Sequence, residues 1–238
     1  MTNAVYTAIT RQSGLRHEMQ VLANNIANMS TTGYRAEAVL FSEFVQPVER
    51  GGDALSMASA RARHTLDTQG ALSQTNGAFD LAIEGEGFFQ IETPNGLRLT
   101  RAGAFTPNAD GSLVTPDGHP VLDTGGAPVF VPTGAGPIAV SGDGIVSAAG
   151  RLVGQIGVFT PADPTAMTRS TGAAFDPGGE VIAVANPRIK QGFLEGANVN
   201  PITQVARMIE VQRAYELGQS FMDKEDARIR AVLQATRR

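Results

Sequence analysis

Two glutamates, Glu84 and Glu86, come closest to a catalytic pair in residue type and spacing. Residues two apart on a β-strand share one face, and two carboxylates there could act as the acid and base of a glycosidase. Gly85 and Gly87 alternate with them, however, and such glycines indicate a bulge or turn, where solvated glutamate is ordinary. A carboxylate pair alone is a weak motif, so we predict no catalytic residues.

Metal and cofactor motifs are equally weak. The three histidines, His17, His64 and His119, share no helical or hairpin proximity, whereas a zinc site needs clustered ligands. Residues 108–111 and 142–144 resemble fragments of calcium loops, but neither continues with the oxygen ligands and final glutamate of an EF-hand. No P-loop, dinucleotide fingerprint or G-x-S-x-G motif occurs. We therefore predict no metal and no cofactor.

Three asparagines within five residues, Asn24, Asn25 and Asn28, break a local rule of helix formation. Asparagine competes for backbone hydrogen bonds and weakens a helix interior. One explanation is that the helix frays toward Gly33, which favours helix termination. The other is that these amides form hydrogen bonds across a helix–helix interface. The pattern of residues leaves both explanations open.

The segment that carries these asparagines is predicted to be a helix over residues 3–29. Its apolar positions recur in alternating steps of four and three residues, which is the spacing of a coiled-coil seam. Such a narrow stripe requires a partner helix. The seam comprises Met1, Val5, Ala8, Gln12, Leu15, Met19, Leu22, Ile26 and Met29.

A second helix is predicted over residues 201–236, with Asn200 as N-cap and Pro201 at the first helical position. Polar residues spaced seven apart, Gln212, Gln219 and Asp226, interrupt its seam, which favours a multi-stranded bundle over a simple hairpin. The two terminal seams therefore indicate assembly rather than catalysis. The second seam comprises Val205, Met208, Tyr215, Met222, Ile229 and Leu233.

The amino-acid composition argues against several kinds of partner, site and targeting segment. The net charge is −4 and there is no basic block, so a nucleic-acid partner is not expected. With no cysteine, the chain forms no disulfide or thiolate metal site. There is no apolar run of about 18 residues, so we expect no direct membrane insertion. The first 30 residues lack the features of a cleaved signal peptide, so export would use another route.

Glycine and proline concentrate in the middle of the chain: 22 of 27 glycines and 11 of 13 prolines fall within residues 70–196. Because both residues mark turns and destabilise helix interiors, this stretch is predicted to be all β. Turns recur at short intervals, including Asn95-Gly96, which favours an antiparallel sandwich or a barrel-like domain. The predicted fold class is α+β: terminal helices form a coiled-coil assembly domain around a central β-domain.

Particular motifs resemble those of the bacterial flagellar rod and hook proteins. At the N-terminal end these are residues 20–28, QVLANNIAN, followed by STTGYR at 30–35. At the C-terminal end EGANVN, residues 195–200, precedes Met208-Ile209 and residues 212–216. In the middle, the pattern that looks like the β-domain of the rod members comprises residues 79–83, Gly85, and residues 87–89, 100–105 and 111–115. The resemblance covers nearly the whole chain.

This resemblance implies a structural, non-enzymatic subunit whose terminal helices pack with those of other copies into a tubular core around a channel. Together with the residue patterns, it predicts four segments: an N-terminal helix (1–33), an extended and partly β connector (34–77), an outer β-rich domain (78–190) and a C-terminal helix (191–238). The implied interface residues are Val5, Leu15, Met19, Leu22, Asn24, Asn25, Ile26, Asn28, Met29, Asn198, Asn200, Val205, Met208, Ile209, Tyr215, Met222, Ile229 and Leu233.

The implied partners are copies of this chain, other proximal and distal rod subunits, and the flagellar type III export apparatus. The implied location is the basal-body rod within the periplasm. Chain length favours the F-type members of the proximal rod, as does Tyr6, where the distal G-type members tend to carry Trp. The alternatives are a G-type rod protein, a secreted β-domain glycan binder or enzyme, and a coiled-coil adhesin or scaffold unrelated to flagella.

Overall fold

The computed structural model describes residues 2–46, 55–132, 134 and 136–235, with side chains described outside residues 2–6 and 41–63. The chain divides into two compact units. The first, here called the helical unit, comprises Met1–Ala27, Ala36–Leu66 and Val199–Arg238. The second, the β unit, comprises Asn28–Arg35 and Asp67–Asn198.

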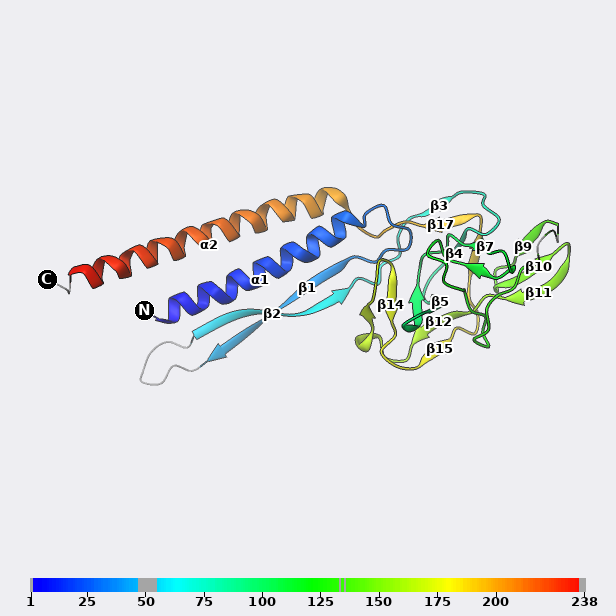
Figure 1. Cartoon of the computed structure of the whole chain (residues 1–238), viewed down its shortest axis with the longest axis horizontal. Coiled ribbons are helices and arrows are strands. Elements are labelled where there is room, and N and C mark those ends of the chain that lie inside the picture. The colour runs from blue at the N-terminus through cyan, green and yellow to red at the C-terminus, as the bar shows by residue number, and fades with distance from the viewer. Residues whose placement is uncertain (1, 47–54, 133, 135, 236–238) are drawn as a thin grey trace. The chain divides into compact units, whose positions relative to one another are not determined.

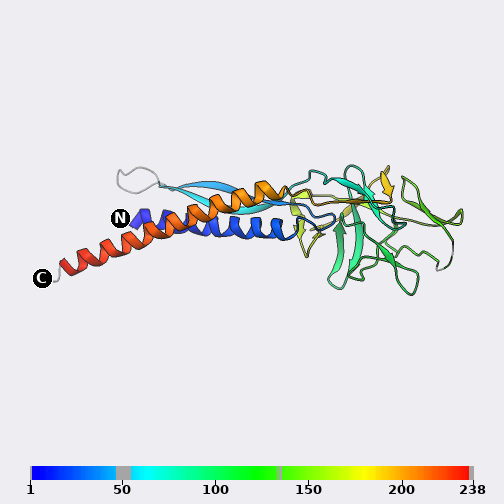
Figure 2. The same cartoon turned by 90° about the horizontal axis from the view of Figure 1, so that it is seen from above.

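Two long helices, α1 (Thr2–Ala27) and α2 (Pro201–Ala235), form most of the helical unit. They lie side by side in both views (Figure 1, Figure 2). Asn200 caps α2 as predicted, because its Oδ1 accepts hydrogen bonds from the backbone N–H groups of Ile202 (3.1 Å) and Thr203 (3.3 Å). Helices at both ends of the chain are therefore confirmed. Neither is long and apolar enough, over its described residues, to cross a membrane.

A long β-hairpin completes the helical unit and contacts α1. Strands β1 (Glu37–Gln46) and β2 (Leu55–Thr65) pair antiparallel, from Glu37 opposite Thr65 to Gln46 opposite Leu55. The register shifts between Leu40 and Phe41. The hairpin falls in the stretch predicted as an extended, partly β connector.

The β unit is built from antiparallel sheets. In order, its six-stranded sheet contains β13 (Thr168–Arg169), β14 (Ala174–Asp176), β6 (Gly96–Thr100), β5 (Phe88–Thr93), β12 (Val158–Pro161) and β15 (Val181–Ala183). A three-stranded sheet contains β11 (Arg151–Gln155), β10 (Ile145–Ala148) and β9 (Ile138–Val140).

Three short pairs extend this architecture: β16 (Ile189–Gln191) with β4 (Leu81–Ile83), β17 (Phe193–Glu195) with β3 (Leu72–Gln74), and β7 (Thr106–Pro107) with β8 (Leu113–Val114). A 3₁₀ turn, η1, spans Pro164–Ala166. The predicted antiparallel, β-rich centre is therefore confirmed, whereas its packing as a sandwich stays a prediction.

Local differences from the predicted strands have physical causes. The β5–β6 hairpin turns at Pro94-Asn95, one residue before the predicted Asn95-Gly96, because proline presets the turn and Gly96 takes a φ of +99°. Residues 152–159 do not form one continuous strand: they belong to two strands in different sheets, β11 and β12. The chain leaves the first sheet at Ile156 and Gly157 before it enters the second.

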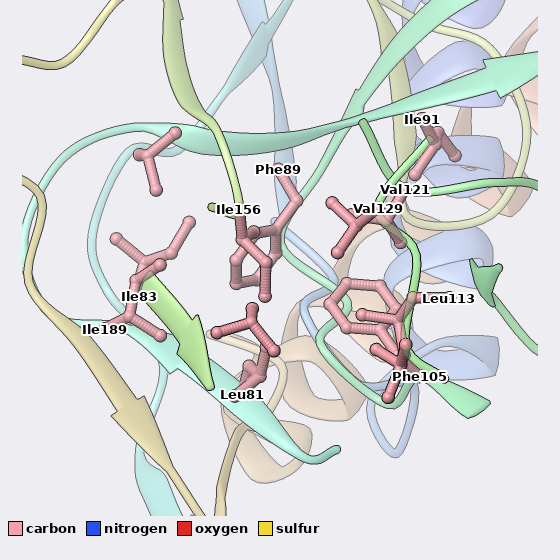
Figure 3. Packing of buried hydrophobic residues seen from close by; sticks show 13 residues of the cluster. Leu81, Ile83, Phe89, Ile91, Phe105, Leu113, Val121, Val129, Ile156 and Ile189 are labelled. Atoms are coloured by element: carbon pink, nitrogen blue, oxygen red, sulfur yellow. The ribbon is translucent and has the colours of Figure 1, made fainter. Parts of the chain in front are cut away.

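One large apolar cluster holds the β unit together (Figure 3). At its centre Phe89 and Phe105 meet edge to face, with ring centroids 5.2 Å apart. A smaller cluster forms around Leu99, Phe159 and Phe175. The large cluster comprises Leu81, Ile83, Phe89, Ile91, Phe105, Leu113, Val121, Val129, Val131, Val146, Ile156, Val158 and Ile189.

Candidate assembly interface

Three polar contacts fix how α1 and α2 meet. Side chains at successive positions of α1 reach positions of α2 that run backward along the chain, so the helices are antiparallel. The pairs are Gln12 Nε2 to the Tyr215 carbonyl (2.9 Å), Glu18 Oε1 to Arg207 Nε (2.7 Å) and Asn25 Nδ2 to Gln204 Oε1 (3.3 Å).

The contact between Glu18 and Arg207 is an ion pair at the edge of this helix interface. Its hydrogen bond to the Glu18 carboxylate raises the pKa of Arg207, against a smaller opposing effect of burial. The Arg207 side chain is half exposed, so solvent screens the pair and limits it to about 1 kcal/mol. The pair therefore sets the register more than it stabilises the unit.

Asn25 is the most buried of the three clustered asparagines. Its Nδ2 donates to the Glu37 carbonyl (2.8 Å), and its Oδ1 accepts from the Glu37 backbone N–H (3.0 Å). With the bond to Gln204, one amide joins α1, β1 and α2. This amide therefore bonds across a helix–helix contact inside one chain, and it also holds the hairpin.

We expect Asn25→Asp to lower the free energy of unfolding of the helical unit by about 3 kcal/mol, because a carboxylate would face two acceptor oxygens in a buried position. Urea unfolding followed by far-ultraviolet circular dichroism measures the change. Asn24→Asp, at an exposed neighbouring position, is the matched control, with an expected cost below about 1 kcal/mol. Equal costs in the two variants would contradict the assignment.

The other predicted interface residues of α1 differ in burial. Leu22 is buried, Leu15, Met19 and Ile26 are half-buried, and Asn24 is exposed. The side chain of Val5 lies outside the described residues. Part of the predicted α1 seam is therefore used for packing within the chain.

The predicted residues of α2 divide between two faces. Met208, Tyr215 and Met222 are half-buried on the side where Val211 packs. Val205 and Ile209 lie on the exposed side. Ile229 and Leu233, near the end of α2, are exposed as well. Much of the apolar surface of α2 thus faces solvent in the single chain.

Three predicted residues belong to the β unit. Asn28 is half-buried and Met29 is exposed. Asn198 donates from Nδ2 to the carbonyl of Thr68 at 2.8 Å. Its backbone N–H donates to the carbonyl of Tyr34 at 3.2 Å. Asn198 therefore ties together two chain segments inside the β unit.

Sequence reasoning missed the role of Gly218. A Cβ at this position would lie 2.3 Å from Gln12 Nε2, so glycine lets the Gln12 side chain approach α2 closely. A single glycine inside a long predicted helix was the available signal. Next to this contact, a groove of about 580 Å³ lies between the two helices.

Sequence reasoning also missed a buried ion cluster in the β unit. The Glu195 carboxylate, 1% exposed, contacts Arg35 Nη2 at 3.2 Å and Arg101 Nη1 at 3.1 Å. It also accepts from the Gly70 backbone N–H at 3.0 Å. Burial lowers the pKa of Arg101 to about 10 and also lowers that of Arg35, while the Glu195 charge opposes both shifts. Both guanidiniums remain charged at neutral pH.

The structure shows the surroundings of Glu84 and Glu86, the carboxylate pair considered for catalysis. Glu84 Oε1 forms an ion pair with Lys190 Nζ at 3.1 Å, and both side chains are partly exposed. Glu86 is exposed. Across the described part of the chain, no group of three or more His, Asp or Glu residues could hold a metal ion.

Comparison with known families defines the class of protein. Residues 5–35 match the model described as flagella basal body rod protein. Residues 82–148 match the D1 domain of the flagellar hook protein FlgE/F/G, and residues 190–235 match the C-terminal region of the flagellar basal body rod FlgEFG protein. The matches fall in both units and together define a protein of the flagellar rod and hook.

Individual relatives show which rod proteins of this class the chain is similar to. The flagellar basal-body rod protein FlgF of Caulobacter vibrioides is 38% identical over 94% of this chain and 93% of its own length. FlgF of Mesorhizobium japonicum is 35% identical over 91% and 90%. The flagellar basal-body rod protein FlgG of Bacillus subtilis is 29% identical over the full length of both. The chain belongs to the flagellar basal-body rod protein family, within which it is FlgF-like. It is a structural protein of the flagellar basal body, not an enzyme.

Proposed function

We propose that the chain is a subunit of the proximal rod and polymerises through its terminal helices into a hollow drive shaft that transmits torque and lines the export channel. The observation that carries this proposal is the apolar surface that α2 leaves exposed. Ile202 is 82% exposed and Ile209 is 44% exposed, with Val205 between them on the same face. Steps of three and four residues make these side chains one stripe.

An exposed stripe of this kind favours association, because covering apolar surface on a partner helix removes it from water. The β unit has its own large core, and its described residues form no α-helix that could offer a comparable stripe. In the proposed assembly the helices of segments 1–33 and 191–238 therefore form the coiled-coil core. The β-rich segment 78–190 packs as a sandwich and lies outside this core. Segment 34–77 connects the two.

The proposed partners are copies of this chain, other rod subunits and the flagellar export apparatus, through which the chain would reach the periplasm. Sequence identity supports a proximal rather than a distal position in the rod. The chain is 38% identical to an F-type relative and 29% identical to a G-type relative. The distal position remains the second candidate, because G-type relatives align over the full length of the chain.

The test is Ile209→Asp, expressed in place of the parental chain. We expect the variant to be missing from purified basal bodies and the cells to lose motility, since a carboxylate would interrupt the stripe. Its thermal unfolding should match that of the parental chain, because Ile209 lies on the exposed side of α2.

Thr203→Asp is the matched control. It places the same carboxylate in the first turn of α2, where acidic residues are favourable, on an exposed position about 120° around the helix from Ile209. This variant should assemble and support swimming. A motile strain that carries Ile209→Asp at parental levels would count against assembly through the helices.

A further inference from the structure

The β unit contains two Asn-Gly dipeptides, Asn76-Gly77 and Asn95-Gly96, in different surroundings. Asparagine followed by glycine is prone to spontaneous deamidation, because glycine has no side chain to shield its backbone nitrogen from the asparagine side chain. In this reaction the nitrogen attacks Cγ of the asparagine, so the two groups must approach each other. The two dipeptides have the same reactive groups, and their surroundings therefore determine which of them reacts.

Asn95-Gly96 lies at the turn of the β5–β6 hairpin. Both residues are exposed, and the Asn95 side chain forms no hydrogen bond with any described residue. The Thr93 hydroxyl donates to the Gly96 carbonyl at 2.7 Å and leaves the Asn95 amide free. Gly96 and Thr93 form the last pair of the ladder, and the end of a ladder opens more readily than its middle. The Asn95 side chain can therefore turn toward the Gly96 nitrogen.

Arg98 places a positive charge beside this turn. A Cβ built on Gly96 would lie 3.6 Å from Arg98 Nη1. The guanidinium is held there by its hydrogen bond to the Leu97 carbonyl (2.7 Å) and by Asp176 (3.2 Å), which offsets part of its charge. During the attack the Gly96 nitrogen loses its proton and negative charge develops on the amide oxygen of Asn95. A neighbouring cation stabilises that charge.

Hydrogen bonds hold Asn76-Gly77 in place on both sides of the reacting groups. Asn76 Oδ1 accepts from Gln74 Nε2 at 2.8 Å. The Asn76 backbone N–H donates to the Gly192 carbonyl at 3.1 Å, and the Gly77 N–H donates to Thr75 Oγ1 at 3.3 Å. These bonds must open before the Asn76 side chain can reach the Gly77 nitrogen.

The charge beside Asn76-Gly77 also has the opposite sign. A Cβ built on Gly77 would collide with the carboxylate of Asp80, so this negative charge lies next to the peptide that would have to lose a proton. Like charges repel, which disfavours the reactive anion at Gly77. Hydrogen bonding and charge thus both favour reaction at Asn95 over Asn76.

We propose that Asn95 is a site of spontaneous modification, selected by the fold, at which the chain converts asparagine to aspartate and isoaspartate. The Gly96 nitrogen forms a bond to Cγ of Asn95, the bond from Cγ to the amide nitrogen breaks, and ammonia leaves. Water then opens the cyclic imide at either carbonyl group, without an oxidant or a reductant. Both products add a negative charge at the turn, and isoaspartate also adds a methylene group to the main chain. The inference does not depend on the proposed function.

Incubating the purified full-length chain at mildly alkaline pH tests the proposal. Samples taken over time are cleaved after glutamate, because Glu84, Glu86 and Glu92 separate the two dipeptides. Mass spectrometry then measures, at each site, the mass gain caused by replacing the amide NH₂ group with a hydroxyl group. We expect deamidation at Asn95 to be about tenfold or more faster than at Asn76, because the hydrogen bonds of Asn76 must open first.

The same measurement on the chain unfolded in guanidinium chloride is the control for the fold. In the unfolded chain the two dipeptides should react at similar rates. Asn95→Gln is the matched variant, since it keeps an exposed amide on a side chain that is longer by one methylene group, which disfavours ring closure. We expect almost no mass gain at this position in the variant.

Equal rates at the two sites of the folded chain would overturn the proposal. So would the absence of any mass gain at Asn95 over a period in which the unfolded chain reacts there. If the faster reaction at Asn95 persisted unchanged in the unfolded chain, the flanking residues rather than the fold would select the site, and the proposal would also be wrong.

Discussion

Replacing Glu195 with glutamine is expected to lower the free energy of unfolding of the β unit by about 3–5 kcal/mol. The carboxylate lies between the guanidiniums of Arg35 and Arg101, each 3% exposed. Without its charge, two buried cations would remain close together, and only the weaker charges of Asp67 and Glu86 would oppose their repulsion. Urea unfolding of the full chain, with hydrogen exchange read on peptides of the β unit, measures the loss.

A surface ion pair in the same unit provides the control. Glu84→Gln removes the carboxylate that faces Lys190, where both side chains are about two-fifths exposed. Solvent screening limits its expected cost to about 0–1 kcal/mol. The prediction fails if the free energy of unfolding of Glu195→Gln lies within about 1 kcal/mol of the parental value, because the cluster would then be dispensable for stability.

This cluster also explains how three of the sequence motifs are related. Arg35 ends the STTGYR motif, Arg101 lies in the motif at residues 100–105, and Glu195 begins EGANVN. Each motif resembled a family pattern in sequence, and the structure brings one charged residue from each into a single contact. The motifs from the two ends of the chain thus help to close the β unit.

Structural features that depend only on residues close together in the sequence were predictable. The cap at Asn200 and the start of α2 follow from local hydrogen bonding and from proline geometry, and both were correct. The end of α1 was placed two residues late, at 29 instead of Ala27, because the apolar spacing continues through Met29. Element ends carry weak signals of this kind.

Contacts between distant segments could not be predicted from one sequence. The bond from Asn25 to the backbone of β1 requires a hairpin whose strands were predicted only as a partly β connector. The contact of Arg35 with Glu195 spans 160 residues, and no periodicity connects them. Spacing predicted the terminal seams, but it could not show which of their residues pack within one chain.

Because some residues of the α1 seam pack within the chain, a charge placed at one of them should unfold the helical unit as well as block assembly. Leu22→Asp is expected to show this effect most strongly. Leu22 is 6% exposed, inside the helical unit. Burying a carboxylate and losing the leucine contacts is expected to cost at least about 4 kcal/mol. We expect the helical unit to unfold, the rod to fail to assemble and motility to be lost, while the β unit, whose large core contains no residue of α1, stays folded.

Hydrogen exchange with mass spectrometry separates these effects. Peptides from α1 and α2 should exchange rapidly in Leu22→Asp, and peptides from β5, β6 and β12 should keep their parental protection. Ala23→Asp places the same charge on the exposed side of the helix and should leave both units protected. Parental protection of α1 in Leu22→Asp would mean that Leu22 is not packed inside the free chain. Its side chain would then have to be placed at an interface between copies, and the loss of motility would arise there instead.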